Sequence, residues 1–192
     1  MNDSVKYTGE FFQIINRNYS DKLNDEFENK DFAVEVAVMS PGVRALIVKD
    51  NMILLTKEYR YELDDWDFRL PGGKVYDDLN HYLIAKNKKT IEMDINSALR
   101  KEIWEETNII VKRFQFLNCS HCGLTVEWDL YYFLVYEFEE KNNVYKKNSY
   151  EHIENQWISI NSALELSLEG KIREARSAFE LIKYILTKGI SV

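Results

Sequence analysis

Three glutamates near the middle of the chain have the type and spacing to bind a divalent cation. Glu102 lies three residues before Glu105 and four residues before Glu106. On a helix such positions share one face, and Ala, Leu, Lys and Glu in this segment favour a helix, capped at its start by Asn96 or Ser97. Clustered carboxylates repel one another unless a cation binds them, and Mg²⁺ or Mn²⁺ prefers oxygen ligands. The segment therefore predicts a helical metal site.

A glycine turn upstream separates this interpretation from a plainer one. A run of glutamates on a helix is otherwise typical of a solvated acidic surface. Residues 70–74 read Leu-Pro-Gly-Gly-Lys, and glycines allow backbone atoms to approach a ligand closely. A close-approach turn just before the carboxylates favours the metal site.

Turn and helix together resemble the Nudix hydrolase signature, G-x5-E-x7-R-E-U-x-E-E-x-G-U, where U is a bulky aliphatic residue. The right half matches, except that Lys101 stands where the family has Arg and Asn108 where it has Gly. Gly73 matches the opening glycine but lies 28 residues before Lys101, twice the 14 of the signature. This spacing predicts a 14-residue insertion within residues 76–94. It also places Met93 where the family has its first glutamate.

The resemblance implies a fold, a cofactor and a set of ligands. The fold would be an α/β/α sandwich with a mixed sheet in residues 39–192, preceded by N-terminal strands in residues 1–38 that would pair two subunits into a homodimer. The cofactor would be Mg²⁺ or Mn²⁺. The metal ligands that the family pattern implies are Gly72, through its carbonyl, and Glu102, Glu105 and Glu106.

The flanking sequence resembles the ADP-ribose pyrophosphatase branch, and this resemblance implies the reaction. Metal-bound water would hydrolyse the pyrophosphate bond of a nucleoside diphosphate derivative, ADP-ribose or a related nucleotide sugar. Glu102 and Glu106 would act in catalysis, and Lys101 would replace the arginine that orients a helix carboxylate, without its planar fork. Glu151 is expected to be the general base, with Glu154 as the alternative.

Four further residues are candidates for substrate binding. Arg60 and Arg69 are expected to contact the phosphates. Trp66 is a candidate for stacking on the base, although such aromatic residues also serve as core. Glu127 is a candidate for binding ribose or metal, with a charge on a sheet surface as the alternative.

Two other functions remain open at this stage. The same chemistry could act on a nucleoside triphosphate or a dinucleotide, because the insertion adjoins the site. A catalytically weak nucleotide-sensing module is the other alternative, supported by Lys101, Asn108 and Met93.

Composition limits the class of protein. The chain has 192 residues, 45% of them hydrophobic, and a net charge of −7, which favours one globular domain and opposes a nucleic-acid surface. It has no apolar run of transmembrane length, so a cytoplasmic protein without membrane contact is expected. Cys119 and Cys122, with His121 between them, suggest zinc, but a lone C-x-x-C lacks a second ligand pair. Reduced thiols are expected there.

The hydrophobic pattern predicts the other elements. Strands are expected at residues 9–18, 32–38, 43–48, 52–56, 110–117, 128–138 and 156–160, and an acidic loop at 62–67. Helices are expected at 163–168, capped by Asn161 or Ser162, and at 172–188.

Overall fold

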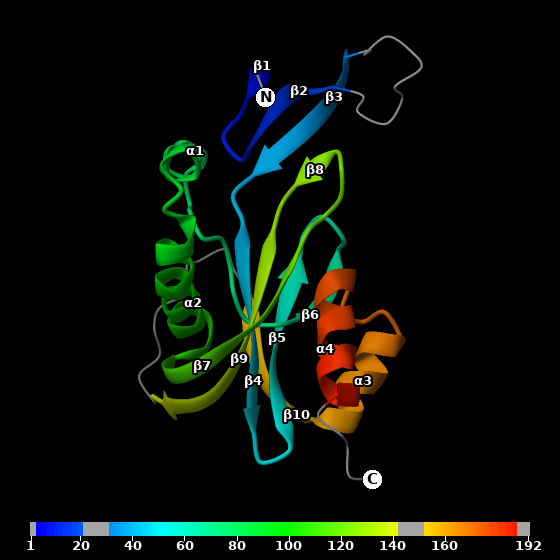
Figure 1. Cartoon of the computed structure of the whole chain (residues 1–192). Helices are drawn as coiled ribbons and strands as arrows, with labels where there is room; N and C mark the ends of the chain where they lie inside the picture. The colour runs from blue at the N-terminus through cyan, green and yellow to red at the C-terminus, as the bar shows by residue number, and fades with distance from the viewer. Residues whose placement is uncertain (1–2, 21–30, 142–151, 188–192) are drawn as a thin grey trace.

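A mixed sheet lies between helices in the computed structural model, which describes residues 3–20, 31–141 and 152–187 (Figure 1). The strand order is β10-β5-β4-β9-β7, and β6 pairs with the second half of β5. Only the β4–β9 pair in this sheet is parallel. The bounds are β4 (Gly42–Lys49), β5 (Met52–Arg60), β6 (Asp65–Arg69), β7 (Ile109–Ser120), β9 (Leu130–Glu140) and β10 (Ile153–Ser159).

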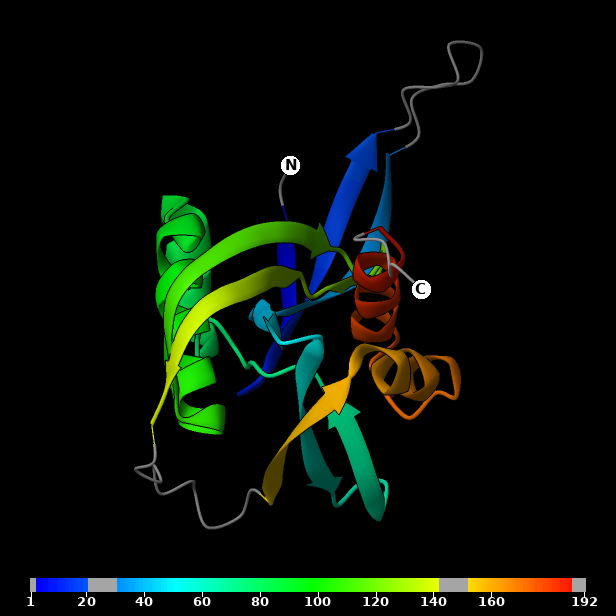
Figure 2. The ribbon, with the colours of Figure 1, turned by 90° about the horizontal axis from the view of Figure 1, so that it is seen from below.

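Helices cover both faces of this sheet, as Figure 2 shows from below. Helix α2 (Ile91–Thr107) lies on one face, and α3 (Ile160–Leu168) and α4 (Ala175–Thr187) lie on the other. The alternation of side chains along β4 explains the two layers. Val43 and Ile47 belong to the core under α2, whereas Leu46 belongs to the core under α3 and α4. The expected α/β/α sandwich is confirmed.

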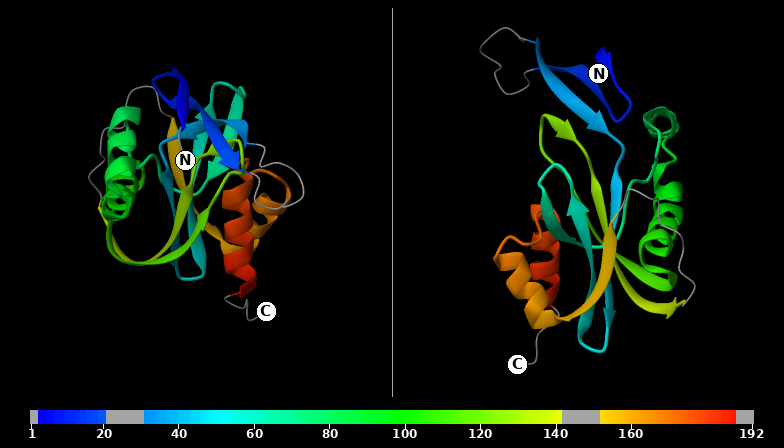
Figure 3. Two further views of the ribbon diagram at one scale, coloured as in Figure 1. Left: turned by 45° about the horizontal axis from the view of Figure 1, so that its top comes forward. Right: turned by 180° about the vertical axis from the view of Figure 1, so that it is seen from behind.

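The N-terminal strands form a second sheet that continues the main one upward (Figures 1 and 3). Its order is β1 (Ser4–Thr8), β2 (Phe12–Ser20), β3 (Asp31–Met39) and β8 (Val126–Glu127). The β3–β8 pair is parallel, like the β4–β9 pair that follows it along both chain segments. The second sheet is therefore anchored to the first by two strand continuations.

The segment predicted as an insertion forms a helix of its own. Helix α1 (Leu79–Lys88) begins after Asp78, whose carboxylate accepts from the backbone N–H of Asn80 at 2.7 Å, as an N-cap does. Its buried face, with Leu79 and Tyr82, packs against the N-terminal sheet. Helix α1 thus supports the second sheet.

Several boundaries differ from the sequence expectation. Helix α2 begins at Ile91, so the predicted caps at Asn96 and Ser97 are wrong; both lie inside the helix. The predicted acidic loop at 62–67 is wrong from Asp65 onward, because that segment pairs with β5 as strand β6. Helix α3 is capped by Ser159, which accepts from the Ser162 N–H at 3.1 Å.

The last helix is shorter than predicted, since α4 begins at Ala175 rather than at residue 172. Strand β1 was not predicted. Within the described residues, no helix has both the length and the apolar character needed to cross a membrane.

Candidate active site

The glycine turn runs along the start of β4 and is fixed there by backbone hydrogen bonds. The Val43 N–H donates to the Gly73 carbonyl at 2.9 Å, and the Ala45 N–H donates to the Pro71 carbonyl at 2.9 Å. The Gly72 carbonyl is not used by these bonds. It therefore remains a candidate metal ligand.

Helix α2 packs so closely on this turn that the glycines cannot be replaced without movement. A Cβ atom on Gly73 would lie 1.9 Å from Oε2 of Glu102, and one on Gly72 would lie 2.2 Å from the Val43 carbonyl oxygen. Gly72 also has φ of +140°, a conformation that favours glycine. Its N–H donates to Oε2 of Glu106 at 2.8 Å. The sequence therefore brings two of the three predicted carboxylates against the turn.

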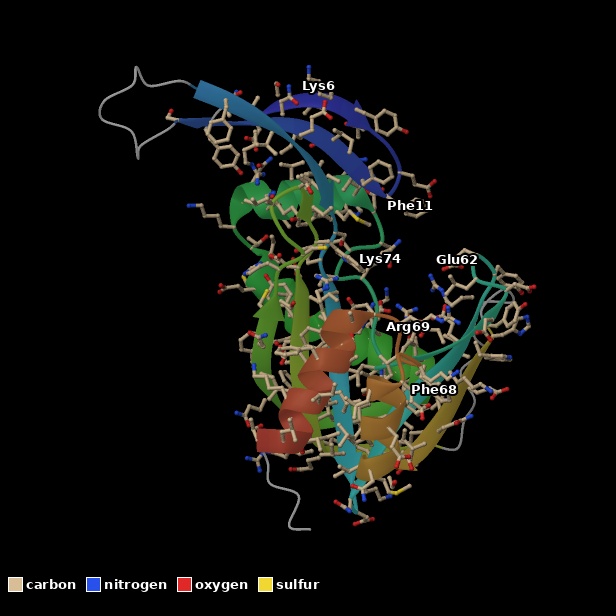
Figure 4. The ribbon with its side chains drawn as sticks, turned by 90° about the vertical axis from the view of Figure 1, so that its right-hand side faces the viewer. Lys6, Phe11, Glu62, Phe68, Arg69 and Lys74 are labelled. Atoms are coloured by element: carbon tan, nitrogen blue, oxygen red, sulfur yellow. The ribbon has the colours of Figure 1, made fainter. Side chains whose placement is uncertain are left out.

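A cavity of about 740 Å³ opens in front of the turn and the helix. It is lined by all three glutamates and by cationic side chains, and aromatic rings form other parts of its wall. The lining includes Glu102, Glu105, Glu106, Gly72, Gly73, Arg44, Arg60, Arg69, Lys74, Lys101, Asp77, Phe11, Tyr76 and Trp128. Figure 4 shows Phe11, Lys74 and Arg69 one below the other, carried by the N-terminal hairpin, the turn and β6.

Burial disfavours the ionised forms of Glu102 and Glu106. It raises the pKa of Glu106 to about 7, although the Gly72 N–H and the Arg44 guanidinium oppose the change. Burial also raises the pKa of Glu102, with Lys101 opposing and Glu105 adding to the rise. A bound divalent cation would favour the ionised forms. The all-oxygen donor set and these raised pKa values fit Mg²⁺ or Mn²⁺.

The three carboxylates line the same cavity, but their oxygen atoms are not close enough together to bind one cation as they stand. Among the described residues, the group of three ligand atoms that lie within 4.8 Å of one another is found elsewhere in the chain. The reason is visible at Glu106, whose carboxylate is turned onto the Gly72 N–H. A cation held by all three glutamates would require small side-chain movements.

Both departures from the signature have a structural explanation. Nζ of Lys101 lies 3.4 Å from Oε1 of Glu102 and 2.9 Å from Oδ2 of Asp77, so a cation still contacts a helix carboxylate. Asn108 ends α2 with φ of +57°, a left-handed conformation that Asn tolerates better than most residues. Met93 is 77% exposed, and Asp77 is the acidic residue that the structure brings to Lys101.

The other predicted residues are placed as follows. Arg60 and Arg69 line the cavity, and both pair with Glu58 on β5. Trp66 is half-buried outside the lining and packs edge-on against Tyr59. Glu154 is exposed on β10, and Glu151 lies outside the described residues.

Glu127 lies in a different environment from the one expected of a substrate ligand. It is outside the cavity lining. Arg17 on β2 donates to it at 2.8 Å, Tyr82 on α1 lies 3.3 Å away, and Lys86 on α1 also pairs with it. These contacts tie the N-terminal sheet to α1, and they lower the pKa of Glu127 in spite of its burial.

Arg44 is the functional candidate that was missed. It is only 5% exposed, lines the cavity and donates to the Val43 carbonyl at 2.8 Å. Burial, with Arg69 nearby, lowers its pKa, and Glu106 opposes this. A charge inside the apolar run of residues 42–48 was the available signal, because a buried charge requires a partner.

Comparison with known proteins agrees with the motif. The family model for the NUDIX domain matches residues 39–179. An 8-oxo-dGTP diphosphatase of Buchnera aphidicola subsp. Schizaphis graminum is 30% identical over 120 residues, 62% of this chain and 75% of that protein. The crystal structure of an ADP compounds hydrolase aligns with a TM-score of 0.67 and 14% identity, over 100% of this chain and 95% of that chain. This last likeness shows the fold.

The raised pKa of Glu106 predicts an unusual pH dependence of stability in the metal-free protein. The folded state keeps a proton up to about pH 7, and the unfolded chain releases it near the ordinary value of 4.5. The folded state therefore binds more protons between these values, and the free energy of unfolding falls as pH rises through this window, by roughly 1–3 kcal/mol. Urea unfolding in a chelator at several pH values measures it. Glu106→Gln should flatten the curve, and Glu165→Gln, on the exposed face of α3, should not.

A second prediction separates the two roles of Glu127. Glu127→Gln leaves Arg17 and Lys86 without a full counter-charge, so the free energy of unfolding should fall by about 1–2 kcal/mol. If Glu127 only links the N-terminal sheet to α1, KM should be unchanged. Urea unfolding and steady-state kinetics measure the two quantities. Glu139→Gln, which breaks exposed ion pairs, is the control and should change neither. A raised KM with unaltered stability would instead support substrate binding by Glu127.

Proposed function

The chain belongs to the Nudix hydrolase family. We propose that the protein hydrolyses the pyrophosphate bond of a nucleoside diphosphate derivative, ADP-ribose or a related nucleotide sugar, which binds in this cavity. The observation that carries the proposal is that carboxylates and cationic side chains line the same cavity. The α2 carboxylates Glu102, Glu105 and Glu106 line it together with the cationic side chains of Arg44, Arg60, Arg69 and Lys74, among other residues. Such a lining suits a ligand that is anionic and is bound together with a divalent cation.

The roles of the residues follow from this mixed lining of carboxylates and cationic side chains. A bound Mg²⁺ or Mn²⁺ would neutralise phosphate oxygens and lower the pKa of a water molecule. Glu102, Glu105 and Glu106, with the Gly72 carbonyl, would hold it. Lys101 would keep the Glu102 carboxylate in place, since its Nζ already lies 3.4 Å from it.

The substrate would be bound by the cationic wall. Arg60 and Arg69 would each exchange part of their pairing with Glu58 for a phosphate oxygen. The proton of the attacking water would go to a carboxylate, and Glu151 stays our prediction for it. Trp66 and Glu127 also stay predictions as substrate contacts, although their present contacts support packing roles.

A triphosphate substrate is the second candidate, and one observation favours it. The relative that is 30% identical is an 8-oxo-dGTP diphosphatase. Both reactions cleave a phosphoric anhydride and would use the same metal-binding helix, so the choice depends on how the rest of the cavity binds the leaving group. Two of the three residues behind the catalytically weak sensing module now support it less, because Lys101 still contacts Glu102 and Asn108 ends α2 in the left-handed conformation. The third, Met93, is exposed and supplies no carboxylate.

We also propose a homodimer formed through the N-terminal strands in a cytoplasmic protein. Apolar side chains on these strands are exposed in the single chain, with Val5 58%, Tyr7 57% and Phe32 53% exposed. Exposed apolar side chains on a sheet become buried when two copies pair there, which is the argument for an interface at these strands. The N-terminal hairpin also contributes Glu10 and Phe11 to the cavity lining, so pairing there would affect the site.

Turnover tests the proposed reaction directly. With Mg²⁺ or Mn²⁺, the protein should convert ADP-ribose to AMP and ribose 5-phosphate. Glu106→Gln keeps the shape and an acceptor for the Gly72 N–H but removes the charge, so kcat should fall by a factor of about 100 or more. Glu165→Gln is the matched control on another helix and should keep the activity of the unaltered protein.

Product analysis decides between the candidates. Release of a nucleoside monophosphate and pyrophosphate from a triphosphate, with no turnover of ADP-ribose, would replace the proposed substrate by the second one. Full activity of Glu106→Gln would contradict the metal site itself. Calorimetric binding of ADP-ribose without turnover under any divalent cation would support the sensing module.

The dimer is tested by light scattering on the eluting protein. We expect a mass twice the 22.8 kDa of one chain. Val5→Glu places a charge on the exposed apolar strands and should shift the mass toward one chain. Leu186→Glu, at an equally exposed apolar position on α4, should leave the dimer intact. A single-chain mass for the unaltered protein would contradict the proposal.

A further inference from the structure

A second group of possible metal ligands lies at the end of the β7–β9 pair, outside the cavity lining. Cys119 is the second-last residue of β7, His121 follows in the loop, and Asp129 directly precedes β9. One ligand atom from each of these residues lies within 4.8 Å of those of the other two. Among the residues that the structure describes, only this group of His, Cys, Asp or Glu side chains has three ligand atoms so close together.

The fold supplies the ligand that the sequence pattern lacked. In the sequence, Cys119, His121 and Cys122 form a C-x-x-C with no second pair nearby. Strands β7 and β9 pair with Cys119 opposite Tyr131, which brings Asp129 back to the beginning of the loop. Nδ1 of His121 then lies 2.7 Å from Oδ1 of Asp129.

The spacing of these atoms suits a tetrahedral ion. Zinc takes nitrogen and oxygen ligands at about 2.0–2.1 Å and sulfur at about 2.3 Å, so two ligand atoms on one ion lie roughly 3.3–3.6 Å apart. The widest separations, which stay within 4.8 Å, would have to contract by about 1.5 Å at most. The Nδ1–Oδ1 pair of His121 and Asp129, at 2.7 Å, would have to open by about 0.6 Å. The His121 side chain is 74% exposed, which provides both an entry path and freedom to adjust.

The ligand types select the kind of metal. A thiolate and an imidazole favour Zn²⁺ over Mg²⁺, whereas the carboxylates of α2 offer only oxygen. The group therefore differs in chemistry from the candidate active site.

We propose that Cys119, His121 and Asp129 bind one Zn²⁺ ion, with solvent in the fourth position. The ion would join the loop to the strand pair. Asp129 also accepts a backbone hydrogen bond from Gly42 at 2.8 Å, and the neighbouring Trp128 lines the cavity. The zinc site would thereby stabilise one wall of the active site without taking part in its chemistry.

Cobalt provides a spectroscopic test that distinguishes the two sites. The full chain, reduced with a phosphine and saturated with Mg²⁺, is titrated with Co²⁺. A thiolate ligand gives a sulfur-to-cobalt charge-transfer band, which carboxylates cannot give. We expect this band at one equivalent of Co²⁺, its loss on adding Zn²⁺, and a rise in Tm with Zn²⁺.

Variants assign the ligands. Cys119→Ser should remove the band, and Asp129→Asn should weaken Zn²⁺ binding by about tenfold or more, as measured by competition with a chromophoric chelator. Cys122→Ser is the matched control and should keep the band, because its thiol lies outside the group. Glu106→Gln should also keep it, which makes the result independent of the proposed hydrolase activity.

Three results would overturn the proposal. They are a cobalt complex without a thiolate band, a band that survives Cys119→Ser, and a band that Cys122→Ser abolishes. If Cys119→Ser does not fold, as judged by circular dichroism, Asp129→Asn and His121→Asn carry the test. Unchanged zinc affinity in both of these variants would contradict the ligand set.

Discussion

The close contact between the glycine turn and α2 is the constraint on which the site depends. A side chain at Gly73 would displace the Glu102 carboxylate, which occupies the space where a Cβ would lie. The Gly72 N–H binds the Glu106 carboxylate at the same contact. Packing there buries both carboxylates, and this burial raises their pKa values. Buried carboxylates are stabilised by positive charge, which the Arg44 guanidinium supplies in part. The packing therefore favours a cationic ligand at this contact.

This contact also explains how a long connection between the turn and the helix is accommodated. The turn is held by backbone bonds to β4, and the helix is held by apolar residues in the core, among them Leu99 and Ile103. Of the residues between them, Tyr76 donates to Asp94 and Asp77 pairs with Lys101, both on α2. The connection can lengthen at small entropic cost, and its length is used to build α1 beneath the N-terminal sheet. Glu127 becomes the polar link between these parts, through Arg17 and Lys86.

What the sequence could predict was local, and what it could not predict was brought together by the fold. The glutamates lie on one helix, so their spacing was enough. The start of α2 was missed because residues 91–95 are helical through their packing on the core, Ile95 above all, without a side-chain cap. Strand β6 was missed because its acidic residues face partners from other segments, as Asp67 accepts from the Arg173 N–H at 3.1 Å. The charge of Arg44 inside an apolar strand could have been noticed in the sequence, but the sequence does not show which residues it contacts.

The two departures from the signature are best understood as changes of residue that keep a geometry. Asn108 takes the left-handed conformation that ends the helix, so the chain can enter β7 as a glycine would allow. Lys101 lacks the planar fork of arginine and cannot bind a carboxylate through two parallel bonds. Its ammonium is instead shared between Glu102 and Asp77, two acids that approach it from α2 and from the segment before α1. A point charge placed between two carboxylates restrains the helix carboxylate from a second direction, and this compensates for the geometry that one flexible side chain cannot provide.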